Sequence, residues 1–167
     1  KGTGGCIFCN ASGSGDFAAH RCTTISVQLE EAKLRIKNKL PKNGSGYGYA
    51  AYYQSYKNTY APVEYLRTLF TETIRQPDID ALFIGTRPDC LPVPVLQLLK
   101  ALSAEKPVYV ELGLQTAKPE SALYINRCYD NSVFEQAVLA LNNIGIPVIV
   151  HCILGLPYET TEDMKHT

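Results

Sequence analysis

The chain has 167 residues, of which 46% are hydrophobic and 19% charged, a composition typical of one globular domain and not of a disordered segment. Lys+Arg and Asp+Glu both number 16, so the net charge gives no indication of nucleic-acid or membrane binding. No apolar run is long enough to span a bilayer, and no signal peptide opens the chain.

Two cysteines three residues apart stand near the start, in Gly4-Gly5-Cys6-Ile7-Phe8-Cys9. Glycines allow the backbone to turn both sulfurs toward one metal or cluster. The spacing alone leaves four kinds of site open: half of a zinc site, a redox dithiol, part of an iron–sulfur site, or two buried thiols. Cys22 is a candidate third thiolate, whereas the simplest reading makes Cys90, Cys128 and Cys152 packed thiols.

The hydrophobic pattern then predicts alternating strands and helices. The expected strands are 47–53, 81–84, 108–112 and 147–154. The expected helices are 25–40, one that begins near Pro62, 93–103, a short one at 121–127, one capped by Ser132 and ended by Gly145, and a last one capped by Thr160 or Thr161. This alternation indicates an α/β fold with about four parallel strands, as either a (β/α) barrel-like sheet or an open doubly wound sheet.

Each predicted strand is followed by a cluster of residues that a simple turn does not need. The four clusters are Gln54-Ser55, Thr86-Arg87-Pro88-Asp89, Gln115-Thr116 and Gly155-Leu156-Pro157-Tyr158-Glu159. The carboxyl ends of parallel strands share one edge, where α/β proteins place their sites. We therefore expect a functional site at this edge.

Three ionisable residues stand out near this edge. Glu111 lies within an apolar strand, so its charge needs a partner or a ligand if it points inward, and otherwise it faces the surface. His151 lies inside the fourth strand and is predicted to be a core histidine with its hydrogen bonds made. Arg127 either binds a carboxylate or faces solvent. The tyrosine cluster could stack a base, but packing in the core and loops is the better prediction; its members are Tyr47, Tyr49, Tyr52, Tyr53, Tyr56 and Tyr60.

Taken together, these motifs resemble the radical SAM superfamily. The segments that carry the resemblance are Gly4 to Cys9, Tyr53 to Pro62, Thr86 to Leu91, Glu111 to Thr116, and Gly155-Leu156-Pro157. More narrowly, the chain is similar to bacterial radical SAM proteins akin to the Elongator catalytic subunit family. The order and spacing of the motifs, over essentially the whole chain, make the resemblance specific.

The resemblance implies a partial (β/α) barrel that holds a 4Fe–4S cluster through three cysteines and leaves one iron open to S-adenosylmethionine. One electron from the reduced cluster would cleave the sulfonium bond and yield a 5′-deoxyadenosyl radical that abstracts hydrogen from a substrate. Such an enzyme needs an electron donor such as flavodoxin or ferredoxin. An oxygen-sensitive cluster and the lack of an export signal suggest the cytoplasm. Kinship to Elongator-type enzymes suggests RNA as a substrate, without independent support from the charge.

The resemblance also assigns individual residues. Cys6 and Cys9 match the last two cluster ligands, and Phe8 matches an aromatic residue beside the adenine. Gln54 and Ser55 match the motif that meets the methionine amino group, and Thr86 and Arg87 match the third-strand edge. Glu111 and Gln115 match the ribose and methionine contacts, and Arg127 a partner of the methionine carboxylate. The stretch that lines the adenine corresponds to Ile153, Gly155 and Leu156.

Two departures qualify the resemblance. The first cluster cysteine is expected upstream of residue 1, and Cys22 does not stand where the motif needs a ligand. Cys128-Tyr129 replaces an expected small residue and His. With no initiating Met and a helix cut at Thr167, we expect residues 1–167 to be a fragment of the core domain that is inactive alone.

Two other functions compete with the radical SAM enzyme. A non-catalytic zinc- or RNA-binding α/β module would use Cys6, Cys9 and either Cys22 or His20 as ligands. A thiol–disulfide oxidoreductase would use Cys6 and Cys9, although the pair is not visibly at a helix N-terminus, where a thiol pKa is lowered.

Overall fold

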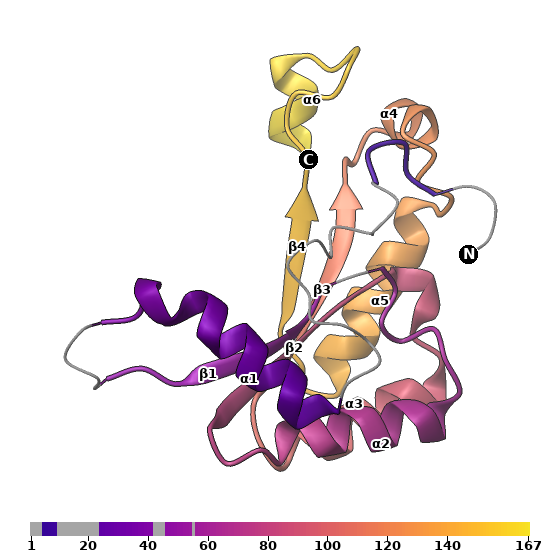
Figure 1. Cartoon of the computed structure of the whole chain (residues 1–167). Helices are drawn as coiled ribbons and strands as arrows, with labels where there is room; N and C mark the ends of the chain where they lie inside the picture. The colour runs from indigo at the N-terminus through magenta and orange to yellow at the C-terminus, as the bar shows by residue number, and fades with distance from the viewer. Residues whose placement is uncertain (1–4, 10–23, 42–45, 55) are drawn as a thin grey trace.

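Four parallel strands form one sheet in the order β1-β2-β3-β4 (Figure 1). The strands are β1 (Tyr49–Tyr53), β2 (Ile79–Thr86), β3 (Val108–Gln115) and β4 (Val148–Cys152). The structure is a computed structural model that describes residues 5–9, 24–41, 46–54 and 56–167.

The strand order decides between the two predicted architectures. A doubly wound sheet reverses its strand order at a switch point, whereas a (β/α) barrel adds each strand beside the preceding one. Here every strand pairs with the next strand along the chain. The sheet is therefore a partial (β/α) barrel, and the doubly wound alternative is wrong.

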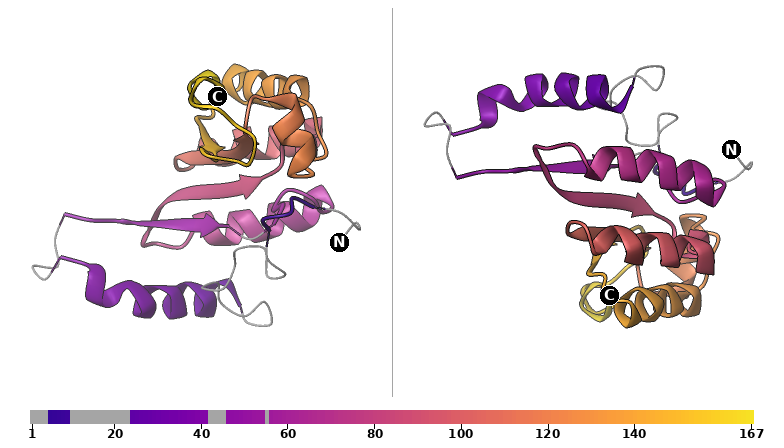
Figure 2. Two further views of the ribbon diagram at one scale, coloured as in Figure 1. Left: turned by 90° about the horizontal axis from the view of Figure 1, so that it is seen from above. Right: turned by 90° about the horizontal axis from the view of Figure 1, so that it is seen from below.

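Helices flank the sheet, and the longer ones that connect consecutive strands cover one of its faces. They are α1 (Ile25–Ile36), α2 (Val63–Ile74), α3 (Val93–Ser103), α4 (Pro119–Tyr124), α5 (Asn131–Asn143) and α6 (Thr161–His166), with short 3₁₀ turns at Lys37–Lys39 and Pro88–Cys90. The views from above and below show α2, α3 and α5 following one another in chain order (Figure 2). Helix α1 packs beside α2.

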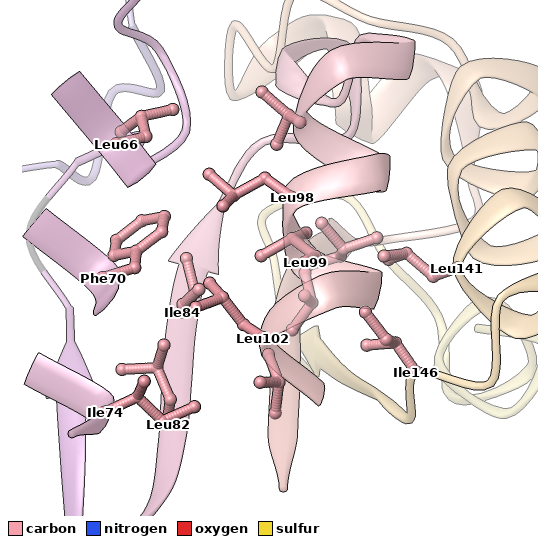
Figure 3. Close-up of a cluster of buried hydrophobic side chains, with 14 of the residues drawn as sticks. Leu66, Phe70, Ile74, Leu82, Ile84, Leu98, Leu99, Leu102, Leu141 and Ile146 are labelled. Atoms are coloured by element: carbon pink, nitrogen blue, oxygen red, sulfur yellow. The ribbon is translucent and has the colours of Figure 1, made fainter. Parts of the chain in front are cut away.

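The hydrophobic core lies between the sheet and these helices (Figure 3). Leu82 and Ile84 of β2 have no exposed surface, and neither has Phe70 of α2 or Leu99 of α3. Such residues recur every second position on a strand and every third or fourth position on a helix, which is the pattern that predicted both kinds of element. Burial of each large side chain stabilises the fold by roughly 1.5–3 kcal/mol, so this core fixes the strands that carry the site.

The other face of the sheet is only half-buried. Side chains alternate along a strand, so the residues between the core positions point to this face. They include Phe83 and Tyr109, whose rings stack with centroids 4.5 Å apart. We call this surface the inner face, because it corresponds to the inside of the barrel.

Most predicted boundaries differ from the structure by a few residues. Strand β2 begins before Ala81 and ends after Ile84, and β3 continues past Leu112 to Gln115. The short helix predicted at 121–127 is Pro119–Tyr124, and the helix predicted at 25–40 ends in a 3₁₀ turn. The prediction that Ser132 is a cap is wrong, since α5 begins at Asn131 with Asp130 before it.

Two predicted helix ends are confirmed. Thr160 caps α6 in a capping box with Asp163, and Gly145, at φ 78°, follows the end of α5 in the left-handed conformation that glycine adopts without strain.

Candidate functional site

A carboxylate held by two other strands lies at the centre of the inner face. The Tyr52 hydroxyl of β1 donates a hydrogen bond of 2.5 Å to Oε2 of Glu111 in β3. Nε2 of His151 in β4 lies 2.8 Å from the same oxygen. Because a carboxylate only accepts hydrogen bonds, Nε2 carries the proton in this contact. Three strands thus converge on one oxygen atom.

The register of the sheet explains why these residues meet. Glu111 is opposite Gly85 on β2, and Tyr52 is opposite Phe83, two residues earlier. Strand β2 lies between these two residues, so the Tyr52 side chain crosses this strand to reach Glu111. On the other side, His151 is opposite Gly113, two residues beyond Glu111 on the same face.

Glu111 is the most buried member of this cluster, and one of its oxygens is engaged by two hydrogen bonds. Only 11% of the Glu111 side chain is exposed, whereas 51% of the His151 side chain is. Burial, together with the hydrogen bond to Glu111, raises the pKa of Tyr52, so the phenol stays protonated as a donor. Of the two orientations that the sequence left open for Glu111, the structure shows the inward one. The prediction of a core histidine is wrong, because His151 lies on the half-open inner face.

The Gln115 side chain points to the same face because the pairing of β3 with β4 is irregular at the end of β3. The pairing with β4 shifts register between Gly113 and Gln115, and Gln115 has φ 66°, a conformation that costs a non-glycine residue about 1–2 kcal/mol. Its amide lies over Gly113, where a Cβ atom would come within 2.3 Å of Nε2. Bulges that direct a side chain and strained backbone residues both gather at functional sites.

The segment that contains Cys6 and Cys9 docks beside α4 (Figure 1). The Ile7 amide donates to the Ile125 carbonyl at 3.0 Å, and Asn126 Nδ2 donates to the Gly5 carbonyl at 3.1 Å. Both cysteines are free thiols, and Cys9 is exposed. Phe8 between them is exposed as well.

The Cys6 thiol is poorly suited to redox exchange. Burial raises its pKa, and the neighbouring thiol of Cys9 raises it further. A dithiol that attacks disulfides instead needs a lowered thiol pKa. Both the loop position and the direction of this shift therefore argue against the oxidoreductase alternative.

Two arginines and a tyrosine tie the neighbouring loops together. Arg87, after β2, donates two hydrogen bonds to Asp89, at 2.9 and 2.8 Å; these bonds raise the pKa of Arg87 and lower the pKa of Asp89. The guanidinium carbons of Arg87 and Arg127 lie 5.0 and 4.9 Å from the centroid of the Tyr129 ring. The Tyr129 hydroxyl donates to the Gly113 carbonyl, and burial raises its pKa to about 12.

Arg127 is buried, so the alternative in which it faces solvent is wrong. Only 2% of it is exposed. It donates to the carbonyls of Leu114, Thr116 and Tyr129, and to the side chain of Asn131. These four bonds leave one of its five N–H groups for another acceptor. The pairing with a methionine carboxylate remains a prediction.

The structure does not bring every predicted residue to the inner face. Thr86 is buried, and its hydroxyl pairs with that of Thr59 at 2.6 Å. Gln54 is exposed just past the end of β1, while Ser55 lies outside the described residues. After β4, the Ile153 amide donates to the Gln115 carbonyl at 2.8 Å, so the stretch that continues through Gly155 and Leu156 begins at the strained turn of β3.

For the remaining cysteines and tyrosines, the structure confirms some of the predictions of burial and contradicts others. Cys90 is buried as predicted, but Cys128 and Cys152 are exposed. Tyr53 packs on Phe70 with ring centroids 5.1 Å apart, which confirms core packing for this member of the tyrosine cluster. Four other members are exposed: Tyr47, Tyr52, Tyr56 and Tyr60. Cys22 and His20 lie outside the described residues.

The donor set fits the predicted cofactors in part. Two thiols on one docked loop suit a cluster that needs cysteine ligands. In the part of the chain that the structure describes, no three Cys, His, Asp or Glu side chains are grouped to hold a metal. The inner face offers a carboxylate and an amide toward a polar ligand. Near the same edge, Oε2 of Glu159 is buried without a hydrogen-bond partner, while its Oε1 accepts from Thr116 at 2.5 Å.

Sequence reasoning missed the partners of Glu111. The sequence presents Tyr52 as a member of an aromatic cluster and His151 as a core residue. The sequence does place Tyr52, Glu111 and His151 near the carboxyl ends of predicted strands. The alternation of side chains along each strand could have suggested that they share a face of the sheet. Only the register, however, shows that they share one face.

Comparisons with known proteins give close relatives of about twice the length. The chain is 43% identical over 164 residues to protein YtqA of Bacillus subtilis strain 168, and 37% identical over 168 residues to protein YhcC of Escherichia coli K12. These alignments cover 98% and 99% of this chain, but 50% and 52% of the two relatives. The chain thus spans about half the length of the curated relatives it matches.

A solved structure supports the fold, and a family model gives the family. Elp3 of the archaeon Methanocaldococcus infernus, with N-terminal residues 1–46 deleted, superposes with a TM-score of 0.65 at 18% identity, over 83% of this chain and 36% of that one. Among the described residues, no helix has the length and apolar character needed to cross a membrane. The model of the Radical SAM superfamily matches residues 2–167, which is nearly the whole sequence, and the chain therefore belongs to the Radical SAM superfamily.

Proposed function

We propose that the protein to which this chain belongs is a radical SAM enzyme that uses a 4Fe–4S cluster and S-adenosylmethionine. The observation that carries the proposal is the joint placement of two cysteines and two polar ligand groups. The Cys6–Cys9 loop docks on the connection between α4 and α5, and Arg87 and Cys128 are close enough to influence the pKa of Cys6. Glu111 and Gln115 face the same edge from β3.

When bound, the reduced cluster would supply the electron that splits S-adenosylmethionine into methionine and the 5′-deoxyadenosyl radical. Cys6 and Cys9 would be two of its three thiolate ligands, and the third would come from outside the described residues. Phe8 would lie beside the adenine, as would the stretch that contains Ile153, Gly155 and Leu156.

The protein's own groups would bind and orient the cofactor. Glu111 would accept hydrogen bonds from the ribose, and the Gln115 amide would contact the methionine part. Gln54 and Ser55 would meet the methionine amino group, and Thr86 and Arg87 would form the neighbouring edge of the site. Arg127 has one N–H group left, and it would pair with the methionine carboxylate at the end of β3.

The test uses the chain extended to the full length of its relatives, so that an upstream cysteine is included. The protein is reconstituted with iron and sulfide without air, reduced and mixed with S-adenosylmethionine, and 5′-deoxyadenosine is then measured. We expect product with the unchanged protein and none above background with Cys6→Ser or Cys9→Ser. Cys152→Ser is the matched control, because this exposed thiol lies on β4 and should not affect the product.

Other outcomes would support the competing function. A colourless protein that takes up zinc through Cys6 and Cys9 and forms no 5′-deoxyadenosine would contradict the enzyme proposal and favour a binding module. If 5′-deoxyadenosine does form, the electron donor and the substrate follow as the next questions. Ferredoxin or flavodoxin in the cytoplasm is the donor to test first, and RNA is the first substrate class, which a net charge of 0 does not by itself favour.

A further inference from the structure

Glu111 is held by two hydrogen bonds that both reach the same oxygen. Tyr52 donates to Oε2 at 2.5 Å, and His151 lies at 2.8 Å from it. Among the described residues, none donates a hydrogen bond to Oε1. The two partners come from the strands on either side of the carboxylate's own position, β1 and β4, so they constrain its rotation from both directions.

When Oε2 of the carboxylate is fixed in this way, the direction in which the other oxygen, Oε1, accepts hydrogen bonds is fixed as well. Rotation about the last side-chain bond of a free glutamate is broad, so an exposed glutamate offers its oxygens in many directions. Here one oxygen is anchored, and the other is left to accept hydrogen bonds on the half-open inner face. A hydroxyl of a ligand can donate a hydrogen bond to this free oxygen, and a neighbouring hydroxyl lies within reach of the same oxygen.

We infer that His151 and Tyr52 are positioning residues, which orient Glu111 so that its free oxygen selects a ligand with a ribose diol. This inference rests on the proposed function, because the diol is that of S-adenosylmethionine. His151 acts through Glu111 and does not need to touch the cofactor. Its exposed position on β4 makes it replaceable without loss of the core, since the side chain is 51% exposed.

The experiment measures discrimination between two ligands by the full-length reconstituted protein. The probes are S-adenosylhomocysteine, which lacks the sulfonium and is not cleaved, and its 2′,3′-dideoxyribose analogue. Calorimetry gives the dissociation constant of each ligand. The ratio of the two constants measures how strongly the protein recognises the two ribose hydroxyls. We expect His151→Ala and Tyr52→Phe each to weaken binding of the ribose form about fivefold to tenfold and to leave binding of the dideoxy form unchanged.

Two further variants separate positioning from a general structural effect. His151→Gln keeps an N–H group near the position of Nε2, so it should restore most of the discrimination that alanine removes. His166→Ala changes an exposed histidine on α6 and should alter neither constant. Thermal unfolding of each variant shows whether it remains folded.

The outcomes distinguish this inference from the proposed function. A protein that binds S-adenosylhomocysteine, but whose ratio is the same with His151→Ala and Tyr52→Phe, overturns the positioning roles and leaves the proposed function intact. If a variant weakens the binding of both ligands equally, the positioning roles are also overturned, because such a result indicates a general disturbance of the site. An unchanged protein that binds neither ligand and makes no 5′-deoxyadenosine overturns the proposed function, and the inference with it.

Discussion

Cys128 is a single residue whose backbone conformation is strained in this fold. It has φ 63°, a left-handed conformation that costs an ordinary residue about 1–2 kcal/mol because Cβ approaches the backbone. The Sγ atom contacts Asn126 at 3.1 and 3.2 Å, and the side chain is exposed. The family resemblance calls for a small residue here, and the backbone conformation supplies the physical reason.

We therefore predict that Cys128→Gly stabilises the protein. Removal of Cβ should relieve the strain and raise the free energy of unfolding by about 1 kcal/mol, which corresponds to a rise of roughly 2–4 °C in Tm. Cys128→Ala is the control, because it removes the thiol but keeps Cβ. Calorimetry on the metal-free protein compares the two, and an equal gain for alanine would show that the thiol, not the backbone, is responsible.

At the scale of a single element, helix α6 depends on its first turn. Thr160 accepts from the Asp163 amide at 3.2 Å, and the Asp163 carboxylate accepts from the Thr160 amide at 2.8 Å and from Lys118 at 2.9 Å. Such a short helix is not stable by itself. Its cap and the link to Lys118 therefore decide whether it stays folded against the loop after β3.

The state of α6 should depend on pH through Asp163. The backbone hydrogen bond from Thr160 and then the contact with Lys118 lower the pKa of Asp163 from 3.8 to about 2. Because the folded pKa is the lower one, the stabilisation is complete above pH 3.8 and is lost as the pH falls through about 2. The protection of the α6 amides, measured relative to their intrinsic exchange rates, should fall over this range.

Variants of the first turn test this explanation. Thr160→Ala should speed exchange in α6 even at neutral pH, since loss of a cap costs about 1 kcal/mol. Asp163→Asn should remove the pH dependence, while Glu162→Gln should not, because Glu162 lies outside the capping box and pairs with exposed Lys165. A pH dependence that survives in Asp163→Asn would assign it to another group.

At the scale of the whole molecule, stability comes from one core on one side of the sheet. Leu141 of α5 lies in this core with no exposed surface, near Ile146 and Leu99 (Figure 3). Leu139, two residues earlier on the same helix, is 61% exposed. The two positions have the same side chain and the same backbone, so they form a matched pair.

Leu141→Ala should destabilise the whole domain. The lost apolar contact and the cavity left behind together cost about 2–5 kcal/mol. Leu139→Ala should change the free energy of unfolding by less than about 0.5 kcal/mol. Denaturant unfolding measures both, and similar costs for the two variants would contradict the placement of the core.

The sequence alone determined the elements and the family, because both depend on local information. Apolar residues at helical or alternating spacing specify helices and strands, and the order of short motifs around Cys6, Glu111 and Gly155 carried the resemblance. The boundaries of the elements depend on contacts between strands, since β2 and β3 extend through polar or small residues at their ends that pair with neighbouring strands.

Only the tertiary structure decided how the site is assembled. The order β1-β2-β3-β4 selected the barrel over the doubly wound sheet, and the register of the strands brought Tyr52 and His151 to the same oxygen of Glu111. The exposure of His151 and the burial of Arg127 were likewise beyond the sequence. Their hydrogen-bond partners lie on other elements, and contacts between residues far apart in the chain arise only when the sheet forms.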